Sequence, residues 1–135
     1  MQVAVAGAPP ATLLRRYARE ASRADITLRI VGRAESQKLN KRFRKKNYAT
    51  NVLSFPYGRG SGDIVMCHSV IAREAREQGK TLRAHYAHLV VHGILHLRGH
   101  DHVHRSAAAR MEKAEIRILR SLGFGDPYGA GEAVK

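Results

Sequence analysis

The sequence is poor in several residue types, and each shortage excludes a class of protein. Its single cysteine, Cys67, excludes an internal disulfide framework and is typical of a reducing compartment. No apolar run approaches the ~18 residues that a membrane-spanning helix needs. Residues 1–6 lack the basic n-region of a signal peptide. We therefore expect a cytoplasmic protein with no membrane partner.

Acidic residues are also scarce. The 135 residues contain 11 Asp and Glu against 24 Lys and Arg, which gives a net charge of +13 at pH 7. A surplus of this size indicates a polyanionic partner, with nucleic acid as the first candidate. A basic surface kept only for solubility is the alternative. The hydrophobic fraction of 44% excludes wholesale disorder.

Helical and strand patterns alternate along the chain, which indicates an α/β or mixed α+β class. We expect a single domain over residues 1–125, with one central mixed sheet of about four strands and about five helices, followed by a flexible C-terminal tail over residues 126–135. Strands are predicted at 26–31, 51–55 and 63–67, a glycine-rich loop at 57–62, and helices after Pro9-Pro10 and at 34–45, 69–78, 81–98 and 106–122. Leu39 and Phe43 are expected to point inward.

The most informative stretch runs from His92 to His102. Residues four apart lie on one face of a helix, so His92 and His96 can offer their imidazoles to one ion. Gly99 can end the helix by adopting a positive φ, and the chain can then fold back to bring His102 to the same point. The alternative is a run of histidines that binds no metal. We favour a metal site at the end of a helix, because the spacing and the glycine occur together.

Three imidazoles and one open position are typical of a catalytic zinc site, whereas a structural site fills all four positions. The spacing is similar to the zinc motif of metzincin proteases, H-E-x-x-H-x-x-G-x-x-H. Position 93 is glycine, however, where those proteases have the Glu that acts as general base, so peptide hydrolysis is disfavoured. A glycine inside a helix costs about 1 kcal/mol relative to alanine, which indicates that another group approaches Gly93 closely.

The histidine segment resembles the signature of the YbeY family of bacterial rRNA maturation factors, and the match extends over about residues 25–128. The matching motifs are His92-Gly-x-Leu95-His96-Leu97-x-Gly99-x-Asp101-His102, Leu39-Asn40-x-x-Phe43-Arg44, T-N-V-L-S-F-P at residues 50–56, Gly62-Asp63-Ile64 and Met111-Glu112. Three positions depart from the family pattern. His100 replaces a usual Tyr, Val103 replaces a common acidic residue, and Lys45-Lys46 replace a usual glycine and its neighbour.

The resemblance implies a single-domain, zinc-dependent endoribonuclease specific for single-stranded RNA. Its role would be rRNA processing, in particular 16S rRNA 3′ end maturation, and ribosome biogenesis and quality control. The implied partners are rRNA and the ribosomal small subunit. The resemblance also implies one Zn²⁺ per chain on His92, His96 and His102, with Arg44 as a functional residue. A non-catalytic RNA-binding assembly factor with a structural zinc is the alternative.

Arg44 lies in a strongly basic segment. Its members are Lys38, Lys41, Arg42, Arg44, Lys45 and Lys46, six basic residues in nine. We interpret this segment as an RNA-binding surface that follows phosphates, and a solvated helix face is the alternative. In catalysis, Arg44 would stabilise charge in the transition state. The attacking group is either a zinc-bound water or the 2′-OH of the RNA, and the sequence leaves both open.

Three further residues are candidates for supporting the site. Asp101 either orients an imidazole or caps the turn after the helix. His88 continues the histidine stripe and is expected to hydrogen-bond in the pocket, and His100 is expected to line it. His85 is expected to be exposed.

Overall fold

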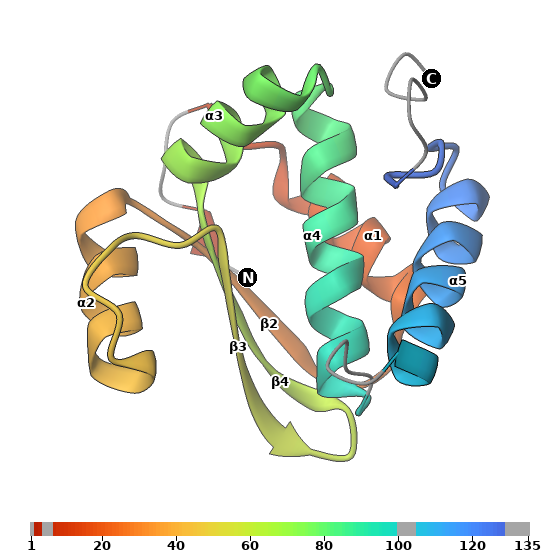
Figure 1. Cartoon of the computed structure of the whole chain (residues 1–135), viewed down its shortest axis with the longest axis horizontal. Helices are drawn as coiled ribbons and strands as arrows, with labels where there is room; N and C mark the ends of the chain where they lie inside the picture. The colour runs from red at the N-terminus through yellow and green to blue at the C-terminus, as the bar shows by residue number, and fades with distance from the viewer. Residues whose placement is uncertain (1, 4–6, 100–104, 129–135) are drawn as a thin grey trace.

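The computed structural model of the chain describes residues 2–3, 7–99 and 105–128. They form a four-stranded sheet in the order β1-β2-β4-β3, with helices on both faces (Figure 1). The strands are β1 (Gln2–Val3), β2 (Ile26–Val31), β3 (Val52–Gly58) and β4 (Ser61–Cys67), and the helices are α1 (Ala11–Ala21), α2 (Arg33–Arg44), α3 (His68–Gln78), α4 (Leu82–Leu97) and α5 (Arg105–Ser121). β1, β2 and β4 run parallel, and β3 is antiparallel to β4. The predicted mixed sheet and number of helices are confirmed.

The sheet separates two apolar clusters of different size. The larger cluster joins one face of the sheet to α1, α4 and α5, and includes Ile64 and Met66 of β4. The smaller one contains Val31, Leu53 and Val65 and packs under α2. β4 therefore has buried side chains on both faces, as its nearly continuous apolar sequence predicts. No helix within the described ranges is long and apolar enough to cross a membrane.

The prediction of a loop over residues 57–62 is wrong, because β3 and β4 form a tight hairpin there. Both strands continue into this segment and leave only Arg59 and Gly60 between them. These two residues have φ values of +55° and +79°, which suits a two-residue turn of type I′. The glycines therefore lengthen the hairpin instead of interrupting it.

α2 meets the sheet with two buried polar residues and with Leu39, which packs on the smaller apolar cluster as expected. The expectation that Phe43 points inward is wrong. Ser36 and Asn40, one helical turn apart, are its buried residues. Ser36 Oγ donates to the carbonyl of Thr50 over 2.9 Å, and Asn40 Nδ2 donates to the carbonyl of Tyr48 over 2.8 Å. The Phe43 side chain is 54% exposed instead. Hydrogen bonds to the segment before β3 thus fix α2 and orient its last turn.

α5 ends in a glycine cap that redirects the chain. Gly123 has a φ of +92°, and Phe124 N donates to the carbonyl of Leu119 over 2.8 Å, the pattern of a Schellman motif. The ring of Phe124 packs edge-on against Tyr17 at 5.6 Å. After this cap the chain continues to Tyr128, whose hydroxyl lies 3.3 Å from Nε2 of His88 on α4.

Candidate metal centre and catalytic cleft

α4 runs through the middle of the molecule and presents three histidines on one face. Thr81 caps its first turn by accepting a hydrogen bond from Ala84 N over 3.1 Å. Apolar residues on most of its circumference are buried, which is typical of a central helix. Gly99, with a φ of +93°, follows the last turn, so the predicted helix end is confirmed. His88, His92 and His96 are each separated by four residues and lie along the same face.

His92 and His96 have the geometry of two ligands to one metal ion. Their Nε2 atoms lie 3.1 Å apart. Two nitrogens at ~2.05 Å from a tetrahedral zinc ion would be about 3.3 Å apart. Both side chains are half-buried, so they remain accessible from a cleft while the helix fixes their backbone. The donor atoms present therefore fit a zinc ion.

The other ring nitrogen of His92 contacts a buried carboxylate on α5. His92 Nδ1 donates to Glu115 Oε2 over 2.6 Å, and Glu115 is fully buried. Burial opposes ionisation of this carboxyl group, yet hydrogen bonds from His88, His92 and Tyr128 hold its pKa at about 2. Glu115 is therefore a carboxylate at neutral pH. In a neutral His92, the proton on Nδ1 leaves a lone pair on Nε2, the atom that faces His96.

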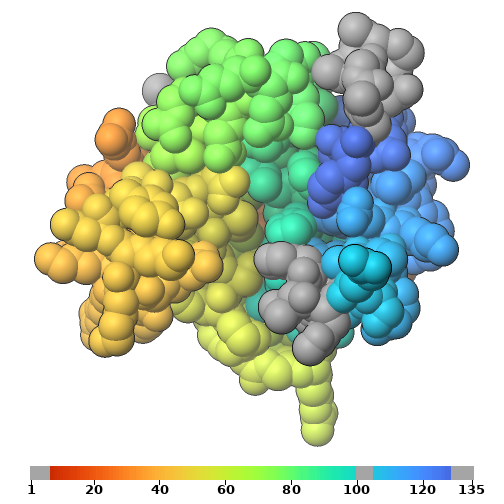
Figure 2. All heavy atoms as spheres, in the orientation of Figure 1, coloured from red at the N-terminus to blue at the C-terminus, as the bar shows by residue number. Residues whose placement is uncertain are grey.

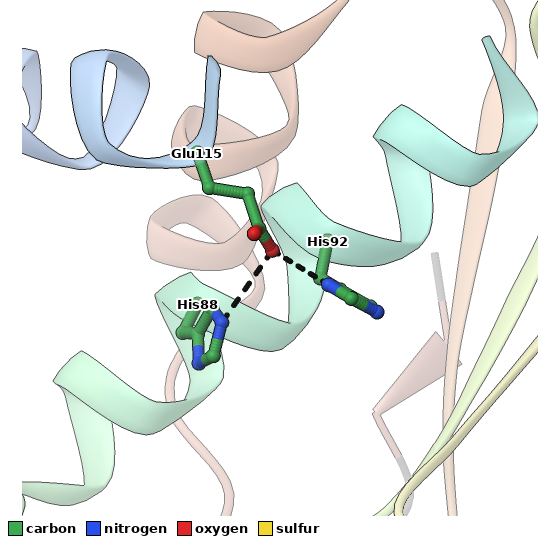
Figure 3. A group of neighbouring side chains, drawn as sticks. All are labelled: His88, His92 and Glu115. Carbon is green, nitrogen blue, oxygen red and sulfur yellow. Dashed lines mark hydrogen bonds and ion pairs between the residues drawn. The ribbon is translucent and has the colours of Figure 1, made fainter. Parts of the chain in front are cut away.

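His88, His92 and Glu115 form a compact group that could itself hold a metal ion, because their potential ligand atoms lie within 4.8 Å of one another. Figure 3 shows the carboxylate of Glu115 between the two imidazoles, with the second nitrogen of His92 directed away from it. His88 Nε2 is 3.5 Å from Glu115 Oε2. His88 Nε2 also lies 3.3 Å from the Tyr128 hydroxyl, and the role of His88 at the site stays a prediction. His100, Asp101 and His102 lie outside the described residues.

A cleft of about 610 Å³ opens beside the two histidines. Its walls are the end of α2, the strand β3 and the C-terminal half of α4, and its lining includes Arg44, Ser54, His92 and His96. In Figure 2 the surface of α4 is recessed between the yellow segment that contains β3 and the blue α5. The fold thus places Arg44 and the histidines, about fifty residues apart in sequence, along one cleft.

The exposed last turn of α2 forms the rim of this cleft. Lys45 ends the helix in the left-handed conformation, with a φ of +59°. The Phe43 ring lies 5.2 Å from the ring of Phe55, nearly perpendicular to it, and the guanidinium of Arg42 lies 5.3 Å from the Phe43 centroid. The basic residues predicted to bind RNA are all exposed: Lys38, Lys41, Arg42, Lys45 and Lys46.

The predicted close approach at Gly93 is confirmed. A Cβ atom at this position would lie 3.1 Å from Ile64 Cδ1 and 3.2 Å from Ser54 Oγ. Ser54 Oγ also donates to the carbonyl of Gly93 over 3.5 Å. A glycine therefore lets α4 lie directly on the sheet, and this contact brings His92 and His96 to the cleft.

The expectation that His85 is exposed is wrong. Its side chain is buried against Glu74, with Nε2 2.9 Å from Glu74 Oε1. Burial lowers the pKa of His85, and the hydrogen bond that its ring donates to Glu74 opposes that shift. Glu74 also accepts from Asn51 Nδ2 over 3.1 Å, so this pair supports the start of β3 at the cleft.

Comparison with known proteins decides the family. The sequence model described as "Endoribonuclease YbeY" matches residues 11–123. The chain belongs to the YbeY family.

Individual relatives agree with this assignment. A protein of Aromatoleum aromaticum named Endoribonuclease YbeY is 52% identical over 91% of this chain and 83% of its own length. One of Polynucleobacter asymbioticus with the same name is 55% identical over 76% of this chain and 69% of its own length. The solution structure of TM1509 from Thermotoga maritima has a TM-score of 0.59 at 24% identity, and covers 95% of this chain and 97% of that one. The last likeness concerns the fold alone.

Two residues at this candidate site were not predicted from the sequence. Glu115 occupies the same helix face as Met111 and Ile118, which are buried, and a charged residue on an apolar stripe is a signal that could have found it. Tyr128 gives no such signal. It lies in the predicted tail, yet its hydroxyl donates to Glu115 Oε1 over 2.6 Å. The remainder of the predicted tail, residues 129–135, lies outside the described residues.

Proposed function

We propose that this YbeY-family protein is a zinc-dependent endoribonuclease that cleaves single-stranded RNA. The observation that carries the proposal is the pair of histidine Nε2 atoms, 3.1 Å apart, beside a cleft that also contains Arg44. The names of the relatives support ribonuclease chemistry. The family resemblance extends the proposal to rRNA, with the 16S rRNA 3′ end as target, the ribosomal small subunit as partner and the cytoplasm as location.

The proposed zinc ligands are His92, His96 and His102. When bound, the ion supplies Lewis acidity toward a phosphoryl oxygen and lowers the pKa of a water ligand. The chain contributes the imidazoles. In a neutral His92, Nδ1–H donates to Glu115 and the lone pair on Nε2 is available to the ion. This arrangement uses a carboxylate to orient a metal-binding histidine, a common pattern in zinc sites.

Arg44 is the proposed phosphate-binding residue. Its guanidinium is a permanent cation with donors that match two phosphate oxygens at once. At the wall of the cleft it can bind the scissile phosphate and stabilise the charge that develops there during cleavage. The exposed ring of Phe43 lies at the same end of the cleft and offers a surface on which an unpaired base can stack.

The experiment that tests this function measures metal and activity together. Purified protein is analysed for zinc and assayed on single-stranded and duplex RNA, before and after chelation and after zinc is restored. We expect one zinc per chain and cleavage of single-stranded RNA that is lost with the metal and regained with it. The double variant His92→Gln/His96→Gln should lose both. Metal-free wild-type protein that cleaves RNA at the same rate would contradict the proposal.

The exposed basic residues of α2 should control how RNA binding depends on salt. Each protein–phosphate contact contributes a slope of about −0.7 to log K against log salt concentration for single strands. The double variant Lys38→Glu/Lys41→Glu is therefore expected to bind RNA more weakly, with a slope shallower by about 0.7 for each contact removed. Fluorescence anisotropy at several salt concentrations measures this slope.

The matched control for that prediction reverses two exposed charges on another helix. Arg15→Glu/Arg16→Glu changes the net charge by the same amount on α1, away from the cleft. If both double variants change the salt dependence equally, net charge alone governs binding and α2 is not the RNA-binding surface.

A further inference from the structure

The carboxylate of Glu115 is held by three donors from two other parts of the chain. His92 Nδ1 and the Tyr128 hydroxyl each donate over 2.6 Å, to different oxygens. His88 Nε2 is 3.5 Å from Oε2 and 3.3 Å from the Tyr128 hydroxyl. A fully buried carboxylate is stable only when it is paired in this way. The network therefore fixes the Glu115 carboxylate in position to accept the hydrogen bond from His92 Nδ1.

The distances decide between two roles for Glu115. Two ligand atoms on one tetrahedral zinc ion lie about 3.3 Å apart. The separation of 2.6 Å between His92 Nδ1 and Glu115 Oε2 is too short for that and is the length of a strong hydrogen bond. The separation of 3.1 Å between His92 Nε2 and His96 Nε2 is within hydrogen-bonding distance and is also close to the spacing of two ligands on one ion. Glu115 and His88 thus lie behind the ligand atoms, on the side of His92 away from His96.

Tyr128 extends this network to the C-terminal segment. Its backbone N–H donates to Asp126 Oδ1 over 2.8 Å, which makes a tight turn after the α5 cap. The ring packs edge-on against the imidazole of His88 at 5.4 Å. Although the residue is 45% exposed, its hydroxyl reaches the buried carboxylate. The segment after α5 is consequently part of the support of the histidine site.

We propose that Glu115 and Tyr128 are positioning residues for the metal centre: Tyr128 holds Glu115, and Glu115 holds His92 with its Nε2 directed toward the metal. This proposal rests on the ligand set of the proposed function. Carboxylates and other partners in this place contribute about 10–100-fold to metal affinity. Their effect should therefore be visible in metal binding itself, without an assay of RNA cleavage.

The experiment measures zinc affinity by competition with a chromophoric chelator. Tyr128→Phe and Glu115→Gln are expected to weaken zinc binding by about 10–100-fold. Tyr48→Phe removes the hydroxyl of another half-exposed tyrosine and should leave affinity unchanged. The visible spectrum of the Co²⁺ form of both test variants should keep the band shape of the wild type, because the ligand atoms are the same. Thermal unfolding of the metal-free proteins shows whether each variant folds. If Glu115→Gln does not fold, the zinc affinity of Tyr128→Phe alone tests the proposal.

Two further variants separate this arrangement from a metal site made of His88, His92 and Glu115. His96→Gln should abolish tight zinc binding, whereas His88→Gln should only weaken it. The reverse result, or a changed Co²⁺ spectrum in Glu115→Gln, would make Glu115 a ligand and overturn the proposal. Wild-type zinc affinity in Tyr128→Phe would remove its positioning role. Failure of the wild-type protein to bind zinc would contradict the proposed function as well, so the two failures are distinguishable.

Discussion

Replacing Arg44 by glutamate is expected to lower the rate of RNA cleavage by about 10²–10³-fold, the usual effect of removing one group that stabilises transition-state charge. Arg44 is exposed at the cleft wall, so the substitution should change neither folding nor the proposed zinc ligands. Single-turnover cleavage of a short single-stranded RNA, with zinc content measured in the same preparation, tests this expectation. The loss should appear in the rate at saturating RNA, because Arg44 acts on the reacting phosphate.

Two neighbouring variants sharpen the interpretation of that result. Arg44→Lys keeps the charge but loses the planar pair of donors, and should recover only part of the activity. Arg42→Glu makes the same charge reversal two residues away, on a side chain that does not line the cleft, and should affect mainly RNA affinity. Equal cleavage by the wild type and Arg44→Glu would remove Arg44 from the mechanism.

Replacing Gly62 by alanine is expected to destabilise the protein by about 3 kcal/mol, near the upper end of the usual cost of overpacking. A Cβ atom at this position would lie 2.4 Å from the backbone oxygen of Phe55 and 2.9 Å from Leu97 Cδ2. The first contact is with the backbone of β3, which cannot move aside without breaking its pairing with β4. Thermal unfolding should show a midpoint lower by about 10 °C.

Gly93→Ala is the matched comparison for Gly62→Ala. Its Cβ would meet the end of the Ile64 side chain at 3.1 Å and Ser54 Oγ at 3.2 Å, and both side chains can adjust. Alanine also gains about 1 kcal/mol of helix propensity over glycine. We therefore expect the stability of Gly93→Ala to stay within about 1 kcal/mol of the wild type. Similar losses at both positions would show that contact with backbone is not the deciding factor.

Much of the site could be predicted from local sequence. A spacing of four on a helix is enough to place His92 and His96 together, and Gly93 between them predicts a close approach of another group. The structure identifies the approaching residues as Ile64 and Ser54. The sequence of β4 predicts a buried strand because its apolar side chains follow one another without alternation. These features depend on backbone periodicity and on the size of the side chains. Both are local properties of a segment and do not change with its position in the fold.

Other features depended on partners distant in sequence. Phe43 occupies an inward position by periodicity, but Ser36 and Asn40 take the buried face because they satisfy backbone carbonyls near β3. His85 is buried because Glu74, on another helix, supplies a partner for its ring. A polar side chain can be buried when a hydrogen-bond partner offsets the loss of water, and the position of that partner is a property of the tertiary structure.

The sequence by itself determined the helix that carries the histidines, the basic segment that contains Arg44, and the family. Only the tertiary structure decided that Arg44 shares a cleft with His92 and His96, and that Glu115 and Tyr128 stand behind His92. The physical reason is the short range of the interactions involved. A hydrogen bond of 2.6 Å between α4 and α5 requires the two helices to pack against each other, and periodicity within one segment carries no information about that distance.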